Sequence, residues 1–196
     1  MTGQQTKDRD GAGAARTLAR SVVLVGLMGS GKSSVGARLA SALGVAMVDS
    51  DDEIEKAANM TVAEIFETRG EAEFRSGERR VLARLMQGEP RVIATGGGAF
   101  MDDETRALVK AEAVSVWLKA DLEVLVARTA GRTHRPLLNR GNPREILGQL
   151  IDTRYPVYAE ADIAVESLHG QTHEAMAARI IDGLRAEGRA FAKEAP

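Results

Sequence analysis

Residues 26–34 read GLMGSGKSS and directly follow the apolar run SVVLV, and this stretch restricts the possible folds more than any other. The pattern G-x-x-x-x-G-K-[ST] is matched by Gly26, Gly31, Lys32 and Ser33. Glycines let the backbone curl so that successive N–H groups point at phosphate oxygens, and the helix that follows adds the positive end of its dipole. The motif therefore predicts a site for a nucleoside triphosphate between a buried strand and a helix.

Within this predicted site, Lys32 would reach the outer phosphates and the Ser33 hydroxyl would bind Mg²⁺. Gly29, Ser30 and Ser34 complete the set of residues expected around the phosphates. Ser34 can instead be a residue of the first helical turn that faces its neighbours. A glycine turn that merely joins strand to helix is the alternative for the whole stretch, but the motif and its flanking pattern agree.

Short apolar runs recur along the chain, and helical patterns fill the gaps between them. The runs are VVLV at 22–25, VAMV at 45–48, VIA at 92–94, AVSVWL at 113–118 and IAV at 163–165. Continuous apolar character is typical of strands buried on both faces of a parallel sheet. The alternation predicts a doubly wound α/β fold with one domain over residues 20–191. Residues 1–19 are polar and rich in glycine and alanine, and we expect them to form a flexible tail.

Composition excludes several classes of function. The chain has 196 residues, a formal charge of -2 and a pI near 6.0, so it lacks the excess of Lys and Arg that a nucleic-acid-binding surface normally shows. It has no cysteine, which removes disulfides and thiolate chemistry, and its three histidines are scattered. No segment has the character of a membrane span or signal peptide, so we expect a cytoplasmic protein without a membrane partner.

Two acidic residues, Asp49 and Asp51, end the second predicted strand, at the edge where open α/β sheets bind ligands. An acidic side chain here could hold Mg²⁺ through water or accept a hydrogen bond from a substrate hydroxyl. Capping of the next helix by Asp51 or Asp52 is the alternative, and the spacing alone does not choose between them.

Three glycines, at residues 96–98, follow the third predicted strand at the same edge of the sheet. Three small residues in a row are expected where a ligand approaches the backbone closely, which favours binding over a merely flexible turn. Arg75 lies in the predicted helical segment GEAEFRSGE, where an ion pair with Glu71 or Glu78 is the simpler explanation for its presence.

The segment at residues 128–145 holds five arginines, two prolines and two glycines, a composition unfit for a core element. It predicts a surface lid at about residues 129–145, whose arginines can close over a triphosphate, offset developing charge and exclude water. A solvated basic loop is the alternative. Farther along, a helix is expected to end at Arg154, just before Pro156, where the positive charge could simply complement the helix terminus.

Together these stretches resemble shikimate kinases, small P-loop kinases of the nucleoside monophosphate kinase type. The resemblance covers about residues 21–168 and rests on six motifs in the family's order: GLMGSGKSS, DSD, GEAEFR, GGG, RPLL and RYPVY. It implies a three-layer α/β/α fold with a five-stranded parallel sheet in the order 2-3-1-4-5. It also implies a monomer that transfers the γ-phosphate of ATP to the 3-hydroxyl of shikimate, a step toward chorismate and the aromatic amino acids.

On the acceptor side, the resemblance implies that Asp51 contacts the ring hydroxyls and orients or deprotonates the acceptor. The substrate carboxylate would be bound by Arg75 and Arg154, together with the backbone of Gly97 and Gly98. An anionic polyol needs bidentate arginines at one end and a carboxylate at the other, so these residues also fit the substrate on chemical grounds.

On the nucleotide side, the resemblance implies that Asp49 supports, through water, the Mg²⁺ that Ser33 binds. Arg135 of the predicted lid would swing toward the transferred phosphate and stabilise its charge together with Lys32. Arg128 would lie near the adenine.

Three other functions are alternatives to this interpretation. A kinase for another small hydroxylated acid, such as gluconate, is the nearest, although gluconate kinases should lack the triple glycine and the paired arginines. A regulatory module that binds ATP without turnover would have no need of Asp51, Arg75 and Arg154. A GTPase-like switch would need a guanine motif of the NKxD type, and none is evident in the sequence.

Overall fold

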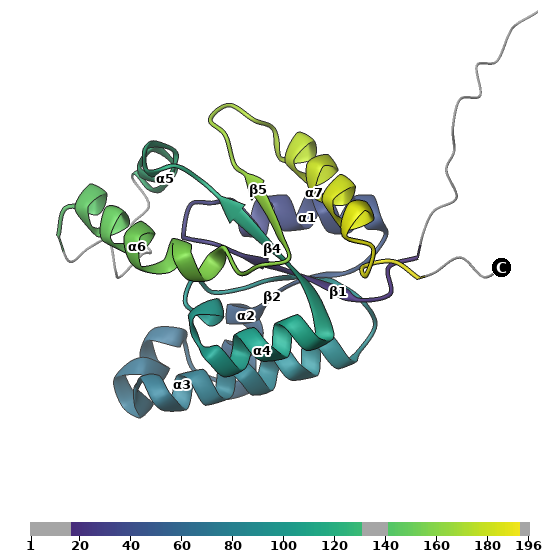
Figure 1. Cartoon of the computed structure of the whole chain (residues 1–196). Coiled ribbons are helices and arrows are strands. Elements are labelled where there is room, and N and C mark those ends of the chain that lie inside the picture. Colours follow the sequence, from purple (N-terminus) through teal and green to yellow (C-terminus); the bar gives the residue numbers. More distant parts are fainter. Residues whose placement is uncertain (1–16, 131–140, 193–196) are drawn as a thin grey trace, which may run out of the picture.

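The apolar run before the glycine-rich motif forms β1 (Ser21–Val25), the central strand of a five-stranded sheet (Figure 1). The computed structural model describes residues 17–130 and 141–192. The other strands are β2 (Met47–Asp49), β3 (Val92–Ala94), β4 (Ala113–Lys119) and β5 (Ile163–Glu166). Every neighbouring pair is parallel in the order β2-β3-β1-β4-β5, so the predicted fold class and strand order are confirmed.

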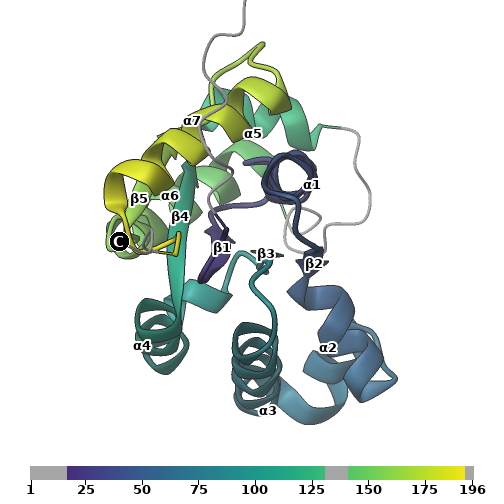
Figure 2. The same cartoon turned by 90° about the vertical axis from the view of Figure 1, so that its right-hand side faces the viewer.

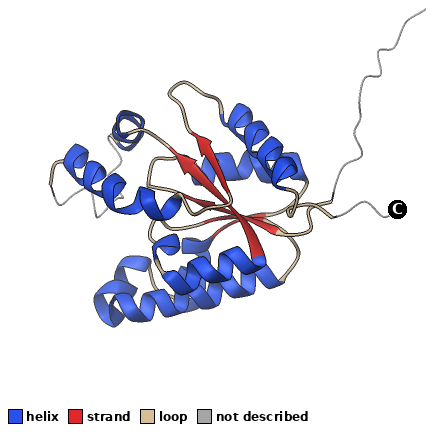
Figure 3. Ribbon diagram, in the orientation of Figure 1, coloured by secondary structure: helices blue, strands red, loops and turns tan. Residues whose placement is uncertain are grey.

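Helices cover both faces of this sheet and so complete three layers (Figures 1 and 2). The helices are α1 (Lys32–Leu43), α2 (Ser50–Ala58), α3 (Val62–Gln87), the short 3-10 helix η1 (Ala99–Met101), α4 (Asp103–Glu112), α5 (Leu122–Thr129), α6 (Pro143–Tyr158) and α7 (His173–Glu187). One face is covered by α1 and α7 and the opposite face by α2, α3 and α4. Figures 1 and 3 show α5 and α6 beyond the carboxyl end of the sheet.

Alternation along β1 explains the two cores. Val22 and Leu24 pack into the cluster with α1 and α7, whereas Val23 and Val25 pack into the cluster with α2, α3 and α4. Because every residue of β1 is buried, the strand is apolar on both faces, as the unbroken run predicted.

Local sequence signals set the ends of several helices. Gly44 ends α1 in the left-handed region, with a φ of 68°. A capping box begins α3, because the Thr61 side chain and the Glu64 side chain each accept from the other residue's backbone N–H. This helix is kinked at Gly70, where φ is 79° and ψ is 172°.

The prediction that a helix ends at Arg154 is wrong, because α6 continues through Pro156 to Tyr158. Proline lacks a backbone donor and destabilises a helix interior, but here it lies in the last turn. Tyr158 is fully buried, and the N–H of Ala159 donates to the carbonyl of Tyr155. The packing of this last turn therefore offsets the cost of the proline.

Residues 17–19 fall within the tail that the composition predicts, but they contact residues 190–192. Leu18 is buried and forms an antiparallel bridge with Phe191, and the N–H of Ala192 donates to the carbonyl of Thr17 over 3.0 Å. The folded unit therefore begins before Leu18, while residues 1–16 lie outside the described residues. In the described part of the chain, none of the helices combines the length and the apolar character that a membrane crossing requires.

Candidate active site

The phosphate-loop motif forms the turn between β1 and α1. Gly26, Gly29 and Gly31 all have positive φ, and a Cβ at Gly26 would lie only 2.8 Å from the carbonyl oxygen of Leu118. Glycine is therefore required at Gly26 by both conformation and space. The Lys32 ammonium folds back over this turn and donates to the carbonyl oxygens of Gly26 and Leu27, over 2.7 and 3.0 Å.

The two other serines predicted around the phosphates differ in their surroundings. Ser30 is buried within the loop, and its carbonyl oxygen accepts a hydrogen bond from Ser167 Oγ over 3.1 Å. Ser34 is exposed on the first turn of α1.

Ser33 and Asp49 lie together beside the loop. Ser33 Oγ donates to Asp49 Oδ2 over 3.2 Å, and Asp49 Oδ1 accepts from the backbone N–H of Asp51 over 3.1 Å. Asp49 is thus the N-cap of α2, which corrects the alternative that Asp51 or Asp52 caps this helix. A hydroxyl and a carboxylate are hard oxygen donors that suit Mg²⁺.

The protein supplies few oxygen donors at this position, as is usual for Mg²⁺ sites that include nucleotide phosphates. Among the described residues, no group of three or more His, Asp or Glu side chains gathers to hold a metal ion. Mg²⁺ commonly keeps waters and takes nucleotide phosphates as further ligands, so one hydroxyl and one carboxylate fit it.

Asp51 lies at the start of α2 and faces the triple-glycine turn. A Cβ on Gly96 would lie 2.7 Å from Asp51 Oδ1, so a side chain there would displace the carboxylate. Burial raises the pKa of Asp51 to about 6, the nearby charge of Asp49 adds to this rise, and Lys32 opposes it. A carboxylate with this pKa is charged at neutral pH and is able to accept a proton.

Arg75 and Arg154 reach the same glycine turn from two different helices, α3 and α6. A Cβ on Gly98 would lie 2.5 Å from Arg75 Nη2, and a Cβ on Gly97 would lie 3.4 Å from Arg154 Nη1. Arg154 Nη1 also donates to the Gly97 carbonyl oxygen over 2.8 Å. The two guanidinium groups therefore converge on residues 97–98, a geometry suited to a carboxylate ligand.

The simpler explanation for Arg75, an ion pair within its helix, also holds. Arg75 Nη1 contacts Glu78 Oε2 at 2.6 Å, and Glu71 is more distant at 3.5 Å. The Glu78 side chain is only 1% exposed, and this burial raises its pKa while Arg75 opposes the rise. The pair is therefore internal and holds Arg75 toward the glycine turn, which spacing alone did not indicate.

The glycine turn also packs against the phosphate loop. A Cβ on Gly97 would lie 3.6 Å from the carbonyl oxygen of Gly26 and 3.9 Å from the backbone nitrogen of Met28. The two predicted anion sites therefore lie next to each other.

On the other side of the loop, Arg128 of α5 contacts the phosphate loop and the segment after β5. Its Nη1 donates to Ser167 Oγ over 2.7 Å and lies 3.4 Å from the Gly29 carbonyl oxygen, and its Nη2 donates to the Leu168 carbonyl over 3.0 Å. Burial lowers the pKa of Arg128. Arg135 and most of the predicted lid lie outside the described residues, so the role of Arg135 stays a prediction.

Three residues at the site were not predicted from the sequence: Glu78, Tyr158 and Ser167. Tyr158 donates from its hydroxyl to the Gly97 carbonyl oxygen. The available signal for Tyr158 was its spacing, because a residue four positions after Arg154 shares its helix face. Ser167 follows β5 and had no such signal.

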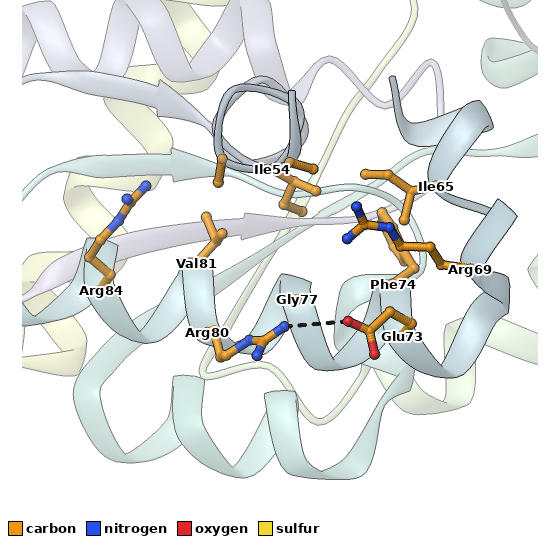
Figure 4. A pocket seen from close by; sticks show the side chains of 11 residues that line it. Ile54, Ile65, Arg69, Glu73, Phe74, Gly77, Arg80, Val81 and Arg84 are labelled. Atoms are coloured by element: carbon orange, nitrogen blue, oxygen red, sulfur yellow. Dashed lines mark ion pairs between the residues drawn. The ribbon is translucent and has the colours of Figure 1, made fainter. Parts of the chain in front are cut away.

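Two surface hollows are lined in part by residues of α2. One is an apolar groove between α2 and α3, with Ile54, Ile65, Phe74 and Val81 along it and arginines at its rim (Figure 4). None of the predicted site residues lines this groove. The other hollow is lined by residues that include Ser33 and Asp49, so it lies at the expected position of the metal.

A phosphate-loop motif and a pair of converging arginines, placed side by side at the carboxyl edge of a 2-3-1-4-5 parallel sheet, are typical of a P-loop kinase of small molecules. The family model for shikimate kinase matches residues 28–185. The chain belongs to the shikimate kinase family, and the predicted resemblance is confirmed.

Individual relatives agree with this assignment. A shikimate kinase from Paramagnetospirillum magneticum is 57% identical over 167 residues, which cover 85% of each chain. One from Caulobacter vibrioides is 52% identical over 168 residues, or 85% of this chain and 83% of the relative. The structure of a shikimate kinase from Acinetobacter baumannii in complex with shikimate covers 89% of this chain and 97% of its own, with 37% identity and a TM-score of 0.82.

The nearest alternative function is represented by a gluconokinase from Sinorhizobium meliloti. Its structure is 22% identical to this chain, with a TM-score of 0.55, and covers 88% of this chain and 99% of its own. This likeness extends to the fold alone.

Proposed function

We propose that this member of the shikimate kinase family transfers the γ-phosphate of ATP to the 3-hydroxyl of shikimate in the cleft between the phosphate loop and residues 96–98. The observation that carries the proposal is the convergence of Asp51, Arg75 and Arg154 on that glycine turn, which itself packs against Gly26. A phosphate donor and an organic acid bound on these two walls would meet at the cleft between them.

On the acceptor wall, Arg75 and Arg154 bind the carboxylate through charge-assisted hydrogen bonds. The backbone of Gly97 and Gly98 allows close approach because it carries no side chain. With the carboxylate held at this end, the ring hydroxyls face Asp51. Asp51 orients the reacting hydroxyl and accepts its proton, for which a pKa of about 6 is well matched at neutral pH.

On the donor wall, the N–H groups of residues 29–33 surround the phosphates, and Lys32 contacts the outer ones. Ser33 and Asp49 would hold Mg²⁺, and Arg128 would lie beside the nucleotide. When bound, Mg²⁺ neutralises charge on the phosphates. Because the transition state of phosphoryl transfer is loose, positioning and charge stabilisation account for most of the catalysis.

The proposal includes the oligomeric state and the location of the protein. A monomer is the proposed catalytic unit, as the family resemblance implies, and the two walls lie side by side within one chain. ATP as co-substrate supports a cytoplasmic location.

The test is a coupled assay of ADP formation by the full chain with ATP and Mg²⁺, given shikimate, gluconate or no acceptor. Turnover is expected with shikimate only. The Lys32→Met variant should form no ADP with any acceptor and excludes a contaminating kinase. Equal ADP formation with gluconate, or without an acceptor, would contradict the proposed function.

A further inference from the structure

The carbonyl oxygen of Gly97 is the point where two side chains of α6 meet the acceptor wall. It accepts one hydrogen bond from Arg154 Nη1, over 2.8 Å, and another from the Tyr158 hydroxyl. Arg154 and Tyr158 are four residues apart and so lie on one face of the helix. Both lone pairs of this carbonyl are therefore engaged, which fixes the orientation of the peptide.

Tyr158 is placed with little freedom. Its side chain is fully buried, and its ring packs near Trp117, at 6.1 Å between centroids, and Tyr155, at 6.2 Å. Burial raises the pKa of Tyr158, so the phenol stays neutral and remains a donor, while the charges of Arg154 and Arg75 oppose the rise. The Tyr158 hydroxyl therefore lies close to the point where Arg75 and Arg154 converge.

We propose that Tyr158 is a positioning residue for the carboxylate of the acceptor, an inference that rests on the proposed function. Its hydroxyl fixes the Gly97 carbonyl, and this carbonyl in turn holds one N–H of Arg154. The other N–H groups of the guanidinium are then directed to the substrate. Without the hydroxyl, Gly97 and Arg154 gain freedom that must be lost again when the acceptor binds.

Tyr158→Phe removes only the hydroxyl, and Tyr155→Phe is its matched control. Tyr155 is on the same helix and packs on the same tryptophan, at 4.9 Å, but its hydroxyl donates to the carbonyl of Ala120, outside the acceptor wall. We expect Tyr158→Phe to raise KM for shikimate roughly 5- to 20-fold, with KM for ATP unchanged and kcat within about threefold. Tyr155→Phe should lower thermal stability and leave KM for shikimate within about twofold.

Direct binding provides a second readout. Trp117 is the sole tryptophan and adjoins both tyrosines, so its fluorescence can report the Kd for shikimate in each variant. This Kd should rise with the KM in Tyr158→Phe only. A double-mutant cycle of Tyr158→Phe with Arg154→Lys should be less than additive, because both changes act on the same carbonyl.

A third measurement does not require removal of the hydroxyl. In the Tyr155→Phe background Tyr158 is the remaining tyrosine of the chain, so uniform incorporation of 3-fluorotyrosine labels this position alone. Its ¹⁹F resonance should shift when shikimate is added and stay in place when ADP is added.

An unchanged Kd and KM for shikimate in Tyr158→Phe would overturn the inference. An equal rise in KM for shikimate in Tyr155→Phe, or a ¹⁹F resonance that does not shift when shikimate is added, would also overturn it. These outcomes leave the proposed function intact as long as the wild-type chain phosphorylates shikimate. A wild-type chain inactive with shikimate would overturn both.

Discussion

At the scale of single residues, burial sets the ionisation of Asp51, the proposed base for the acceptor hydroxyl. The pKa of Asp51 rises from an ordinary 3.8 to about 6 through desolvation and the charge of Asp49. The carboxyl is therefore harder to ionise in the folded chain than in the unfolded chain. Its charge opposes folding above pH 6 and has no such effect below about pH 4.

Asp51→Asn should thus separate activity from stability. We expect kcat to fall at least about 100-fold, because the acceptor hydroxyl loses its base. Stability at pH 8 should rise by about 1–2 kcal/mol, a discounted value for a shift of this size at a partly exposed group. Thermal melts at pH 8 and pH 4 check this, since the gain should vanish at pH 4. Near-normal turnover would remove the proposed role of Asp51.

The pH dependence of the reaction follows from the same group. Because the ionised carboxylate is the active form, kcat/KM for shikimate should fall as the pH drops below about 6. The profile should be level between about pH 7 and 8. Steady-state assays from pH 5 to 8 measure this limb, and a flat profile over that range would show that another group controls the reaction.

At the scale of elements, the bend in α3 depends on one glycine. Gly70 has a φ of 79° and a ψ of 172°, a conformation that is essentially restricted to glycine, and no atom lies within 4 Å of a Cβ placed there. Gly77 in the same helix has helical backbone and equally open space. The two glycines therefore differ in conformation and not in crowding.

Gly70→Ala should cost about 1–3 kcal/mol of unfolding free energy through backbone strain alone. Gly77→Ala, the matched change, should be neutral or stabilise the chain by up to about 1 kcal/mol. Urea denaturation of both variants compares them. A Gly70→Ala variant as stable as the wild type would mean that α3 does not need its kink.

Ser167 joins the segment after β5 to the phosphate loop through Arg128 and the carbonyl of Ser30. Ser167→Ala should raise KM for ATP roughly 3- to 10-fold and leave KM for shikimate unchanged. Ser115→Ala is the control, because Ser115 Oγ is also buried but donates to Asp162. If both variants raise KM for ATP alike, the effect comes from general destabilisation.

At the scale of the whole molecule, the sheet and the phosphate loop were predictable because their signals are local. A buried parallel strand is apolar along its length, and the phosphate loop needs glycines at fixed spacing. Both patterns can be recognised in the sequence before the fold is known. The order of the strands came from the resemblance to a known family, since periodicity alone does not order parallel strands.

The supporting residues of the site were not predictable, because their roles arise from packing between distant segments. The spacing of Glu78 predicts only an ion pair with Arg75 within one helix. The packing of α3 buries the Glu78 side chain, which the spacing does not indicate. From the sequence, a helix is expected to end before Pro156, which would leave Tyr158 outside it. In the structure Tyr158 is buried and belongs to the last turn of α6. The resemblance implies that Asp49 supports a metal ion, whereas its role as the N-cap of α2 becomes evident only from the geometry of that helix.

The most direct test of the account is a crystal structure of the chain with shikimate, Mg²⁺ and a non-hydrolysable ATP analogue. The account predicts the carboxylate between Arg75 and Arg154, and the 3-hydroxyl between Asp51 and the terminal phosphate. A carboxylate bound elsewhere, or a 3-hydroxyl directed away from Asp51 and the phosphate, would contradict it.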